Sequence, residues 1–340
     1  MKVLVTGITG RVGSNVAKDM VAKGVQVRGL VMPGDPAEAK ARALGCEIVS
    51  GDLRDETALA RACDGVDVIC HFAAIMENIP AGMRMPEYFD VNSRSFFCLM
   101  EIARAMGPKL KKLVYSSSTA VYDVWTARNP PIRETHPRTP QHIYGVTKIV
   151  NEDLALAYHF WHRVPVVILR LSYVLAGEAA NIGWDRKTVV WCLKEFGADP
   201  RCGFYAEGVT EPWKAVEEQC QDENAYVCPR TPDGRPWTWH LTDVRDVTHA
   251  TWCAIDSSVT GEIFNIAAPD VAPWDQVGKF LSAKTGRPCR EVTIPNLWHL
   301  EFDISKAKAM LGYRPKYSTM RMLEDSLAMA DGKDIGVIKP

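Results

Sequence analysis

The sequence predicts an α/β protein that combines a doubly wound parallel sheet with a smaller C-terminal α/β region. Over the first half of the chain, short segments that are apolar along their whole length alternate with segments of helical periodicity. Such strands, separated by helices, are typical of a parallel sheet covered by helices on both faces. After about residue 172 the composition changes, and residues 177–240 are rich in Gly, Pro, Trp and charged side chains.

The elements of the first half follow from the hydrophobic periodicity. Strands are expected at residues 2–5, 26–31, 47–49, 66–72, 113–116 and 166–171. Helices are expected at residues 12–23, 36–44, 56–63, 88–106 and 142–162. Gly24, Gly45 and Gly107 follow three of these helices, where glycine commonly ends a helix.

The second half predicts fewer regular elements. A helix is expected at 188–196, a strand, helix and strand at 239–242, 244–255 and 262–266, and tail helices at 274–285, 304–311 and 320–329. Five tryptophans fall between residues 184 and 239, and they either stack on a ligand or form ordinary core: Trp184, Trp191, Trp213, Trp237 and Trp239. We expect a first domain over 1–172, joined by the elements near 239–268, and a substrate-binding region formed by 173–238 and 269–340.

The composition excludes several classes of protein. Of 340 residues, 47% are hydrophobic and 24% charged, as in an ordinary globular protein, and the net charge of −1 gives no basic field for nucleic acid or membrane. No apolar stretch approaches the roughly 20 residues of a membrane-spanning helix. Residues 1–5 indicate a first strand and no secretion signal, so we expect a cytoplasmic protein without nucleic-acid or membrane partners.

The ten cysteines include no C-x-x-C pair, and several lie within apolar segments. In a chain of this length we expect buried, reduced thiols. Zinc binding and disulfides are the less favoured alternatives, and no metal site is predicted.

A glycine-rich segment directly follows the first strand and opens a helix. Its spacing is G-x-x-G-x-x-G, so that backbone amides and the helix N-terminus can approach a pyrophosphate. This placement predicts a Rossmann-type dinucleotide-binding domain. The residues expected to line the phosphate site are Gly7, Thr9, Gly10, Arg11, Val12 and Gly13.

The choice between NAD and NADP stays open. Val31 and Met32 stand at the end of the second strand, where a carboxylate would bind the adenosine ribose of NAD. Arg11 and Arg28 are alternatives for contacting a 2′-phosphate, although a solvated surface position is the favoured interpretation of each. Asp52, followed by Leu53, is placed after the third strand to accept from an adenine amino group.

Tyr144 and Lys148 are one turn apart near the start of the helix expected at 142–162. A free tyrosine has a pKa near 10, about three units above neutral pH, and a nearby ammonium lowers that pKa by favouring the phenolate. A serine-rich segment, 116–118, ends the preceding strand, at the sheet edge where ligands bind in such folds. The pattern predicts an acid/base pair beside a hydroxyl that orients a substrate oxygen.

Taken in order, these motifs resemble the extended short-chain dehydrogenase/reductase family, in its nucleotide-sugar epimerase/dehydratase group. The motifs are T-G-x-x-G-x-x-G at 6–13, D-L at 52–53, H-F-A-A at 71–74, S-S-S-x-x-V-Y at 116–122, Y-x-x-x-K at 144–148, H-L-T-D-V-R-D-V at 240–247 and D-I-S-K-A through L-G-Y-x-P at 303–315. The resemblance extends over nearly the whole chain.

The resemblance implies site residues and a homodimer. Tyr144 would be the acid/base, Lys148 would lower its pKa and hold the nicotinamide ribose, and Ser118 would orient the substrate. Phe72, Ala73, Ala74, Asn92 and Ser116 would join the cofactor site, together with Tyr144 and Lys148. The helices that carry Asn92 and Tyr144 would form the dimer interface.

The resemblance implies hydride transfer at a carbinol carbon, and two reactions remain. The favoured one is epimerisation of a sugar or nucleotide sugar with NAD(P) held throughout; the alternative is an NAD(P)H-dependent oxidoreductase that acts on a non-nucleotide alcohol or carbonyl. Ala120 stands where dehydratases of the group carry an acid, which argues against that branch. Asp123 replaces the glycine of V-Y-G and Ser172 begins a changed N-x-Y-G-P segment, so the alternative stays open. A dinucleotide-binding scaffold without turnover is disfavoured because both Tyr144 and Lys148 are present.

Overall fold

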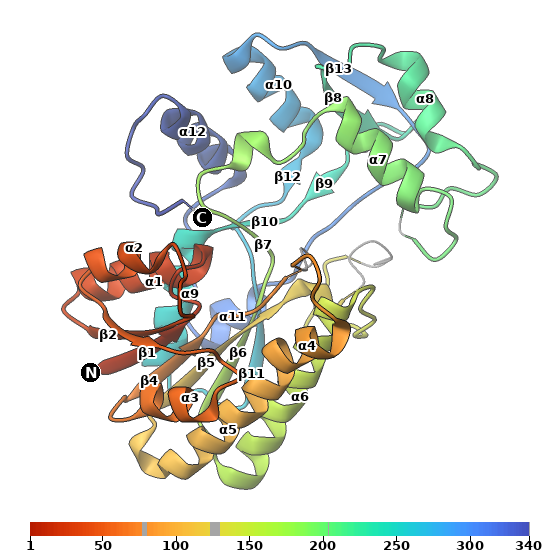
Figure 1. The fold of residues 1–340 in the computed structure, drawn as a ribbon. Helices are drawn as coiled ribbons and strands as arrows, with labels where there is room; N and C mark the ends of the chain where they lie inside the picture. The colour runs from red at the N-terminus through yellow and green to blue at the C-terminus, as the bar shows by residue number, and fades with distance from the viewer. Residues whose placement is uncertain (77–79, 123–129, 203, 340) are drawn as a thin grey trace.

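A computed structural model describes residues 1–76, 80–122, 130–202 and 204–339. Its centre is a seven-stranded sheet in which all neighbouring strands run parallel, in the order β11-β6-β5-β4-β1-β2-β3 (Figure 1). The strands are β1 (Lys2–Thr6), β2 (Gln26–Val31), β3 (Glu47–Ser50), β4 (Val68–His71), β5 (Lys112–Ser118), β6 (Val166–Leu171) and β11 (Glu262–Ile266). The doubly wound parallel fold class is therefore confirmed.

Helices cover both faces of this sheet (Figure 1). Helices α1 (Arg11–Ala22) and α9 (Val244–Asp256) pack together on one face, and α3 (Glu56–Cys63), α5 (Ser95–Met106) and α6 (Ile143–His162) on the other. Successive side chains of a strand point to opposite faces of the sheet, so each strand contributes to a hydrophobic core on either face. Val3 and Val5 join the core beneath α1, whereas Leu4 joins the core beneath α5. This two-sided burial is why the strands are apolar throughout.

Strands β1 and β4 are neighbours, and the chain departs from them toward opposite edges of the sheet. In a doubly wound sheet this reversal of strand order opens a crevice at the carboxyl ends of the strands, where ligands bind. The glycine-rich loop after β1, the H-F-A-A segment after β4 and the serines that end β5 all reach this edge.

The single helix expected at 88–106 is interrupted. It consists of α4 (Met85–Phe89), a π-helical turn (Asp90–Arg94) and α5. A π-turn adds a residue to the helix and commonly marks a functional position. Here it carries Asn92, whose contacts are described below.

The remaining elements form the smaller region above the sheet in Figure 1 and the connections to it. They include α7 (Arg186–Phe196), α8 (Pro212–Gln219), α10 (Trp274–Thr285) and α12 (Thr319–Ala330), whereas α2 (Glu38–Ala43) connects β2 to β3 and α11 (Ser305–Met310) packs against β11 of the main sheet. Three two-stranded sheets pair β7 (Tyr173–Leu175) with β10 (Leu241–Asp243), β9 (Thr238–Trp239) with β12 (Ala272–Pro273), and β8 (Tyr226–Arg230) with β13 (Cys289–Thr293). The sequence did not predict α8, β7, β8, β12 or β13.

Candidate active site

The glycine-rich loop is shaped by close backbone approaches. Gly7 has φ +69°, and a Cβ there would lie 2.7 Å from the Ala73 amide nitrogen at the end of β4. A Cβ at Gly13 would lie 2.1 Å from the Gly7 carbonyl oxygen, so α1 can pack on the loop only through a glycine. The loop is closed by a hydrogen bond from the Gly10 amide to the Gly7 carbonyl, at 3.0 Å.

This loop fits a dinucleotide pyrophosphate. The N-cap of α1 is Gly10, which provides no side-chain cap, and the first turn of α1 contains no acidic residue. The amides of that turn are therefore left for an anion, in the positive field of the helix N-terminus. Thr9, Arg11 and Val12 are all partly exposed around it.

A carboxylate that the sequence did not predict lies beside the loop. Thr9 donates a 2.8 Å hydrogen bond to Oδ2 of Asp35, which follows β2 at the carboxyl edge of the sheet. The other carboxylate oxygen of Asp35 accepts from the amide of Ala37 at 2.8 Å. The acid was expected directly at the end of β2, where Met32 stands, whereas three residues separate Val31 from Asp35.

Both arginines considered for a 2′-phosphate contact protein oxygen atoms. The Arg28 guanidinium is buried and donates to the carbonyl oxygens of Ala62 at 3.0 Å and Asp64 at 2.6 Å, at the end of α3. Arg11 donates to the Val174 carbonyl at 2.8 Å and pairs with Glu178 at 2.8 Å. The favoured interpretation of Arg28 as solvated was wrong, because that residue is buried, whereas the side chain of Arg11 remains 29% exposed.

The residues expected around the adenine and nicotinamide lie at the same edge. The Asp52 carboxylate pairs with Arg54 at 2.6 Å, which lowers the pKa of Asp52, and Leu53 packs against the core beneath α5. Phe72 packs against the core beneath α1, and its amide donates to the Thr6 carbonyl at 3.2 Å. Ala73 and Ala74 continue the chain from there across the mouth of the crevice. Their contacts with a cofactor remain a prediction.

Asn92 shapes the crevice through backbone contacts. Its side-chain oxygen accepts from the Ile75 amide at 2.8 Å, and its amide nitrogen donates to the Ile75 carbonyl at 2.8 Å. The backbone carbonyl of Asn92 accepts from Asn151 at 2.8 Å, which ties the π-turn to α6. Asn92 therefore positions the loop that follows β4, and a direct contact with the cofactor stays a prediction.

Ser118 and Tyr144 are brought together by a tight contact between β5 and α6. A Cβ at Gly145 would lie 2.2 Å from the Ala120 carbonyl oxygen, so glycine next to Tyr144 lets α6 start against the turn at Thr119–Val121. The Ser118 hydroxyl oxygen accepts from the Ala120 amide at 3.1 Å. The Ser118 hydroxyl proton is therefore free to be donated to a substrate oxygen.

Lys148 lies beneath Tyr144 and is 3% exposed. Its ammonium donates to the Ser116 carbonyl at 2.7 Å and lies 5.5 Å from the centroid of the Tyr144 ring. Burial lowers the pKa of Lys148 to about 7, while the negative charge of Glu152 raises it. The structure thus brings the expected ammonium and phenol ring together, and α6 begins against the turn that follows Ser118.

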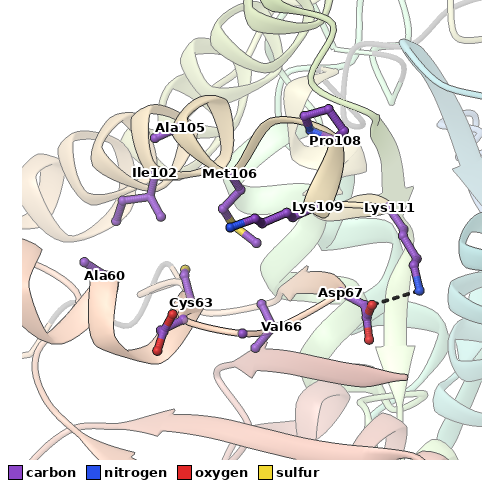
Figure 2. A pocket seen from close by; sticks show the side chains of 12 residues that line it. Ala60, Cys63, Val66, Asp67, Ile102, Ala105, Met106, Pro108, Lys109 and Lys111 are labelled. Atoms are coloured by element: carbon purple, nitrogen blue, oxygen red, sulfur yellow. Dashed lines mark ion pairs between the residues drawn. The ribbon is translucent and has the colours of Figure 1, made fainter.

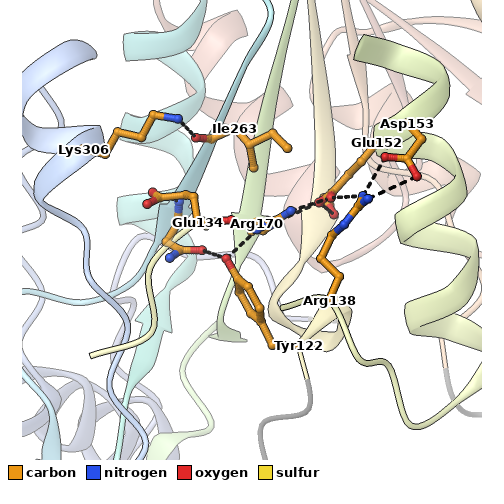
Figure 3. A network of polar contacts seen from close by, with 10 residues as sticks. Tyr122, Glu134, Arg138, Glu152, Asp153, Arg170, Ile263 and Lys306 are labelled. Carbon is orange, nitrogen blue, oxygen red and sulfur yellow. Dashed lines mark hydrogen bonds and ion pairs between the residues drawn. The ribbon is translucent and has the colours of Figure 1, made fainter. Parts of the chain in front are cut away.

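Behind Lys148 lies a buried polar network that the sequence did not predict either (Figure 3). Glu152 follows Lys148 by one turn of α6, and it pairs with Arg170 of β6 and accepts from the Ser117 hydroxyl at 2.6 Å. Two signals were available: Glu152 continues the i, i+4 series of Tyr144 and Lys148, and Arg170 is a charge in an otherwise apolar strand.

The tryptophans mostly form core. Trp184 and Trp237 are 2% and 0% exposed, and both pack against Trp274, with ring centroids 5.0 and 5.6 Å apart. Trp239 is half-buried and lies 5.1 Å from the ring of Tyr173. Asp123, the departure from V-Y-G, lies outside the described residues.

A surface groove lies at the opposite edge of the sheet, before the first residues of β4 and β5. Figure 2 shows its apolar floor, formed by side chains such as Ile102 and Met106, and its rim with the ion pair of Lys111 and Asp67. The groove is remote from the serines and the glycine loop.

Within the described part of the chain, no three His, Cys, Asp or Glu side chains gather to hold a metal ion. None of the helices described there has the length and apolar character to cross a bilayer.

The fold and site define a dinucleotide-dependent enzyme of the extended short-chain dehydrogenase/reductase type. The sequence model of the NAD dependent epimerase/dehydratase family matches residues 3–267, and the chain belongs to this family.

Relatives support this assignment. A UDP-glucose 4-epimerase of Corynebacterium glutamicum is 28% identical over 345 residues, which cover 96% of this chain and 95% of the relative. A UDP-glucose 4-epimerase of Lacticaseibacillus casei is 33% identical over 223 residues, and there the alignment spans 63% of this chain and only 65% of the relative. Sterol demethylase protein B of Methylococcus capsulatus is 31% identical over 308 residues, 87% of this chain and 78% of that protein.

Among solved structures, a short-chain dehydrogenase/reductase superfamily protein from Agrobacterium tumefaciens with bound NAD superposes with a TM-score of 0.77. It is 25% identical and the match covers 98% of this chain and 100% of that chain. The similarity therefore extends beyond the parallel sheet into the smaller region.

Proposed function

We propose that this chain catalyses the NAD-dependent epimerisation of a nucleotide sugar. One observation carries the proposal: Tyr144 and Lys148 share a face of α6, with the Lys148 ammonium 5.5 Å from the phenol ring, next to Ser118 at the end of β5. The relatives named UDP-glucose 4-epimerase support a uridine-diphosphate sugar as substrate and C4 as the reacting carbon.

Each residue has a distinct task. When bound, the nicotinamide would accept a hydride from the carbinol carbon of the substrate and return it. Tyr144 takes the hydroxyl proton and later returns it, and Lys148 stabilises the phenolate form that this requires. Ser118 donates a hydrogen bond to the same substrate oxygen. His71 stays neutral behind the site because burial lowers its pKa to about 3.

Elimination of water is not part of this proposal. The side chain of Ala120 provides no acid or base. Its amide donates to the Ser118 hydroxyl, and its carbonyl packs closely against Gly145. A dehydratase would need a proton donor at this turn to assist the leaving hydroxyl.

We further propose that the cofactor is NAD and not NADP. Asp35 places a carboxylate beside the phosphate loop, and both candidate arginines are engaged by protein oxygen atoms. A carboxylate favours a ribose hydroxyl as its hydrogen-bond donor and repels a 2′-phosphate.

The working form is proposed to be a cytoplasmic homodimer in which residues 173–238 and 269–340 cover the substrate. Large apolar side chains are exposed on α5 and α6, among them Phe97 at 44% and Phe160 and Trp161 at 70% each. An apolar face on these two helices supports an association between copies of the chain. All ten cysteines as free thiols support a reducing compartment.

The test of the activity compares the wild-type protein with Tyr144→Phe. We expect the wild type to interconvert UDP-glucose and UDP-galactose with bound dinucleotide and no net change in nicotinamide absorbance. Tyr144→Phe should bind NAD as tightly and lose turnover at least 10³-fold, within the range of general acid–base catalysis. Stoichiometric formation of reduced nicotinamide with a sterol or other alcohol, or its stoichiometric consumption with a ketone, would instead support the oxidoreductase reaction.

A further inference from the structure

Two cysteines of the smaller region face each other across neighbouring strands. Cys228 lies on β8 and Cys289 begins β13, and the strands run parallel with Cys289 paired to Tyr226. Cys228 follows Tyr226 by two residues, so both thiols point to the same face of this small sheet. Their sulfur atoms are 3.0 Å apart, although the residues are 61 positions apart in sequence.

Helix α10 covers the pair, and it has a glycine where it passes closest to the two sulfur atoms. A Cβ on Gly278 of α10 would lie 2.5 Å from the Cys228 sulfur and 3.2 Å from the Cys289 sulfur. Any larger residue at 278 would push the two thiols apart or lift the helix. Glycine lowers the stability of a helix relative to alanine. At position 278 its missing side chain leaves the space that the two sulfur atoms occupy.

The two thiols differ in access and in charge environment. Cys228 is fully buried, whereas Cys289 is partly exposed. The hydrogen bond from Cys228 and then the Lys279 ammonium lower the pKa of Cys289, against the opposing charge of Glu291. The same contact and burial raise the pKa of Cys228. A partly exposed thiol of lowered pKa beside a buried second thiol is the arrangement of an attacking and a resolving cysteine.

We infer that Cys228 and Cys289 form a reversible disulfide, a modification site of this chain that is separate from its dinucleotide site. The oxidant is a low-molecular-weight disulfide of the glutathione type. The Cys289 thiolate attacks one sulfur of that disulfide and expels the first thiolate. Cys228 then attacks the Cys289 sulfur and expels the second thiolate, which takes up the Cys228 proton as it departs. One S–S bond forms in the protein while one breaks in the oxidant, and two electrons and two protons pass from the cysteines to two small thiols.

The disulfide would link β8 to β13, two strands that are far apart in sequence. Between Cys228 and Cys289 the chain runs through α9 and β11 of the main sheet before it returns to β13. Closing a loop of this length restricts the unfolded chain, so the oxidised protein should unfold about 5 °C higher than the reduced protein.

The experiment uses the full chain, reduced, desalted and then incubated with oxidised glutathione. Free thiols are then alkylated and the protein is digested for mass spectrometry. We expect a cross-linked peptide pair that contains Cys228 and Cys289 and lacks the mass of two hydrogen atoms, and we expect dithiothreitol to reverse it. The thermal midpoint should rise in parallel.

Two variants provide the matched comparison. Cys289→Ser should abolish both the cross-link and the thermal shift, whereas Cys253→Ser, which removes a partly exposed thiol next to His249, should retain both. Full alkylation of Cys228 and Cys289 in the oxidised wild type would overturn the inference. So would a stable mixed disulfide on Cys289 alone, or uptake of a thiophilic metal ion in place of oxidation.

Discussion

Glu152 and Arg170 form a buried two-point ion pair directly behind Lys148. Arg170 Nε donates to Oε1 of Glu152 at 2.8 Å and Nη2 donates to Oε2 at 2.7 Å, and the two residues are 0% and 1% exposed. Arg170 also donates to the Tyr122 hydroxyl at 2.6 Å (Figure 3). The carboxylate held this way is the charge that favours the Lys148 ammonium against burial.

Replacing Glu152 should change the pH dependence of turnover. In Glu152→Gln the pKa of Lys148 falls below its value of about 7, because burial lowers it and Glu152 raises it. The ammonium is then lost at lower pH, so the alkaline limb of the activity profile should move to lower pH. The free energy of unfolding should drop by about 3 kcal/mol, because Arg170 keeps a buried charge without its partner.

The control for that change is Asp153→Asn. Asp153 is the next residue on α6, and its carboxylate is 56% exposed and pairs with Arg138 at 2.7 Å. We expect its profile and stability to match the wild type, since exposed pairs contribute little. A Glu152→Gln profile that is lower but unshifted would assign Glu152 a purely structural role.

Stability should fall in mild acid because of His71. Its pKa in the folded chain is about 3, lowered by burial and then by Lys148, so the unfolded chain takes up the proton first. The contribution of His71 is complete above pH 6.5 and is lost as the pH falls toward 3. Chemical denaturation between pH 7 and 4 should show a shallower decline for His71→Gln than for the wild type. His162→Gln, at the exposed end of α6, should follow the wild-type curve.

Alanine at Gly13 should weaken the cofactor site. Its Cβ would lie 2.1 Å from the Gly7 carbonyl oxygen, so the loop must shift away from α1. We expect NAD binding to weaken roughly tenfold, equivalent to about 1.4 kcal/mol of distortion. Gly24→Ala is the comparison, because Gly24 has φ +77° and a Cβ added there would meet no atom within 4 Å. That variant should lose about 1 kcal/mol of stability while calorimetry finds its NAD affinity unchanged.

Neutralising Asp35 should relax cofactor choice. Asp35→Asn keeps a side chain that accepts from Thr9 but removes the charge beside the loop. NADP binding should improve roughly tenfold, since removing a like charge at this range is worth about 1–2 kcal/mol. Titration with both dinucleotides measures this, and equal affinities of the wild type for NAD and NADP would count against the assignment of Asp35.

Local patterns were sufficient for much of the fold. Five expected elements, at 26–31, 56–63, 166–171, 262–266 and 274–285, have the observed bounds, because hydrophobic periodicity and helix-ending residues are properties of the segments themselves. The strands β8 and β13 were missed because a two-stranded sheet of residues far apart in sequence leaves no local signal.

The candidate site was only partly predictable, for the same physical reason. Tyr144 and Lys148 could be paired because helical spacing is a local property. The bond of Asp35 to Thr9 and the burial of Arg28 depend on how loops and helix ends meet in space. The π-turn carries Asn92, which is hydrogen-bonded to the loop at Ile75, and hydrophobic periodicity does not encode such contacts.

Arg11 connects the phosphate loop to the smaller region, which are the proposed cofactor and sugar sites. It belongs to the first turn of α1 at the phosphate loop, yet its guanidinium holds the Val174 carbonyl and the Glu178 carboxylate at the entrance to the smaller region. A ligand that orders the phosphate loop would therefore also restrain the segment with Val174 and Glu178, and the reverse holds as well. Sugar and dinucleotide affinities should therefore be thermodynamically linked, with the same coupling factor whichever of the two binds first.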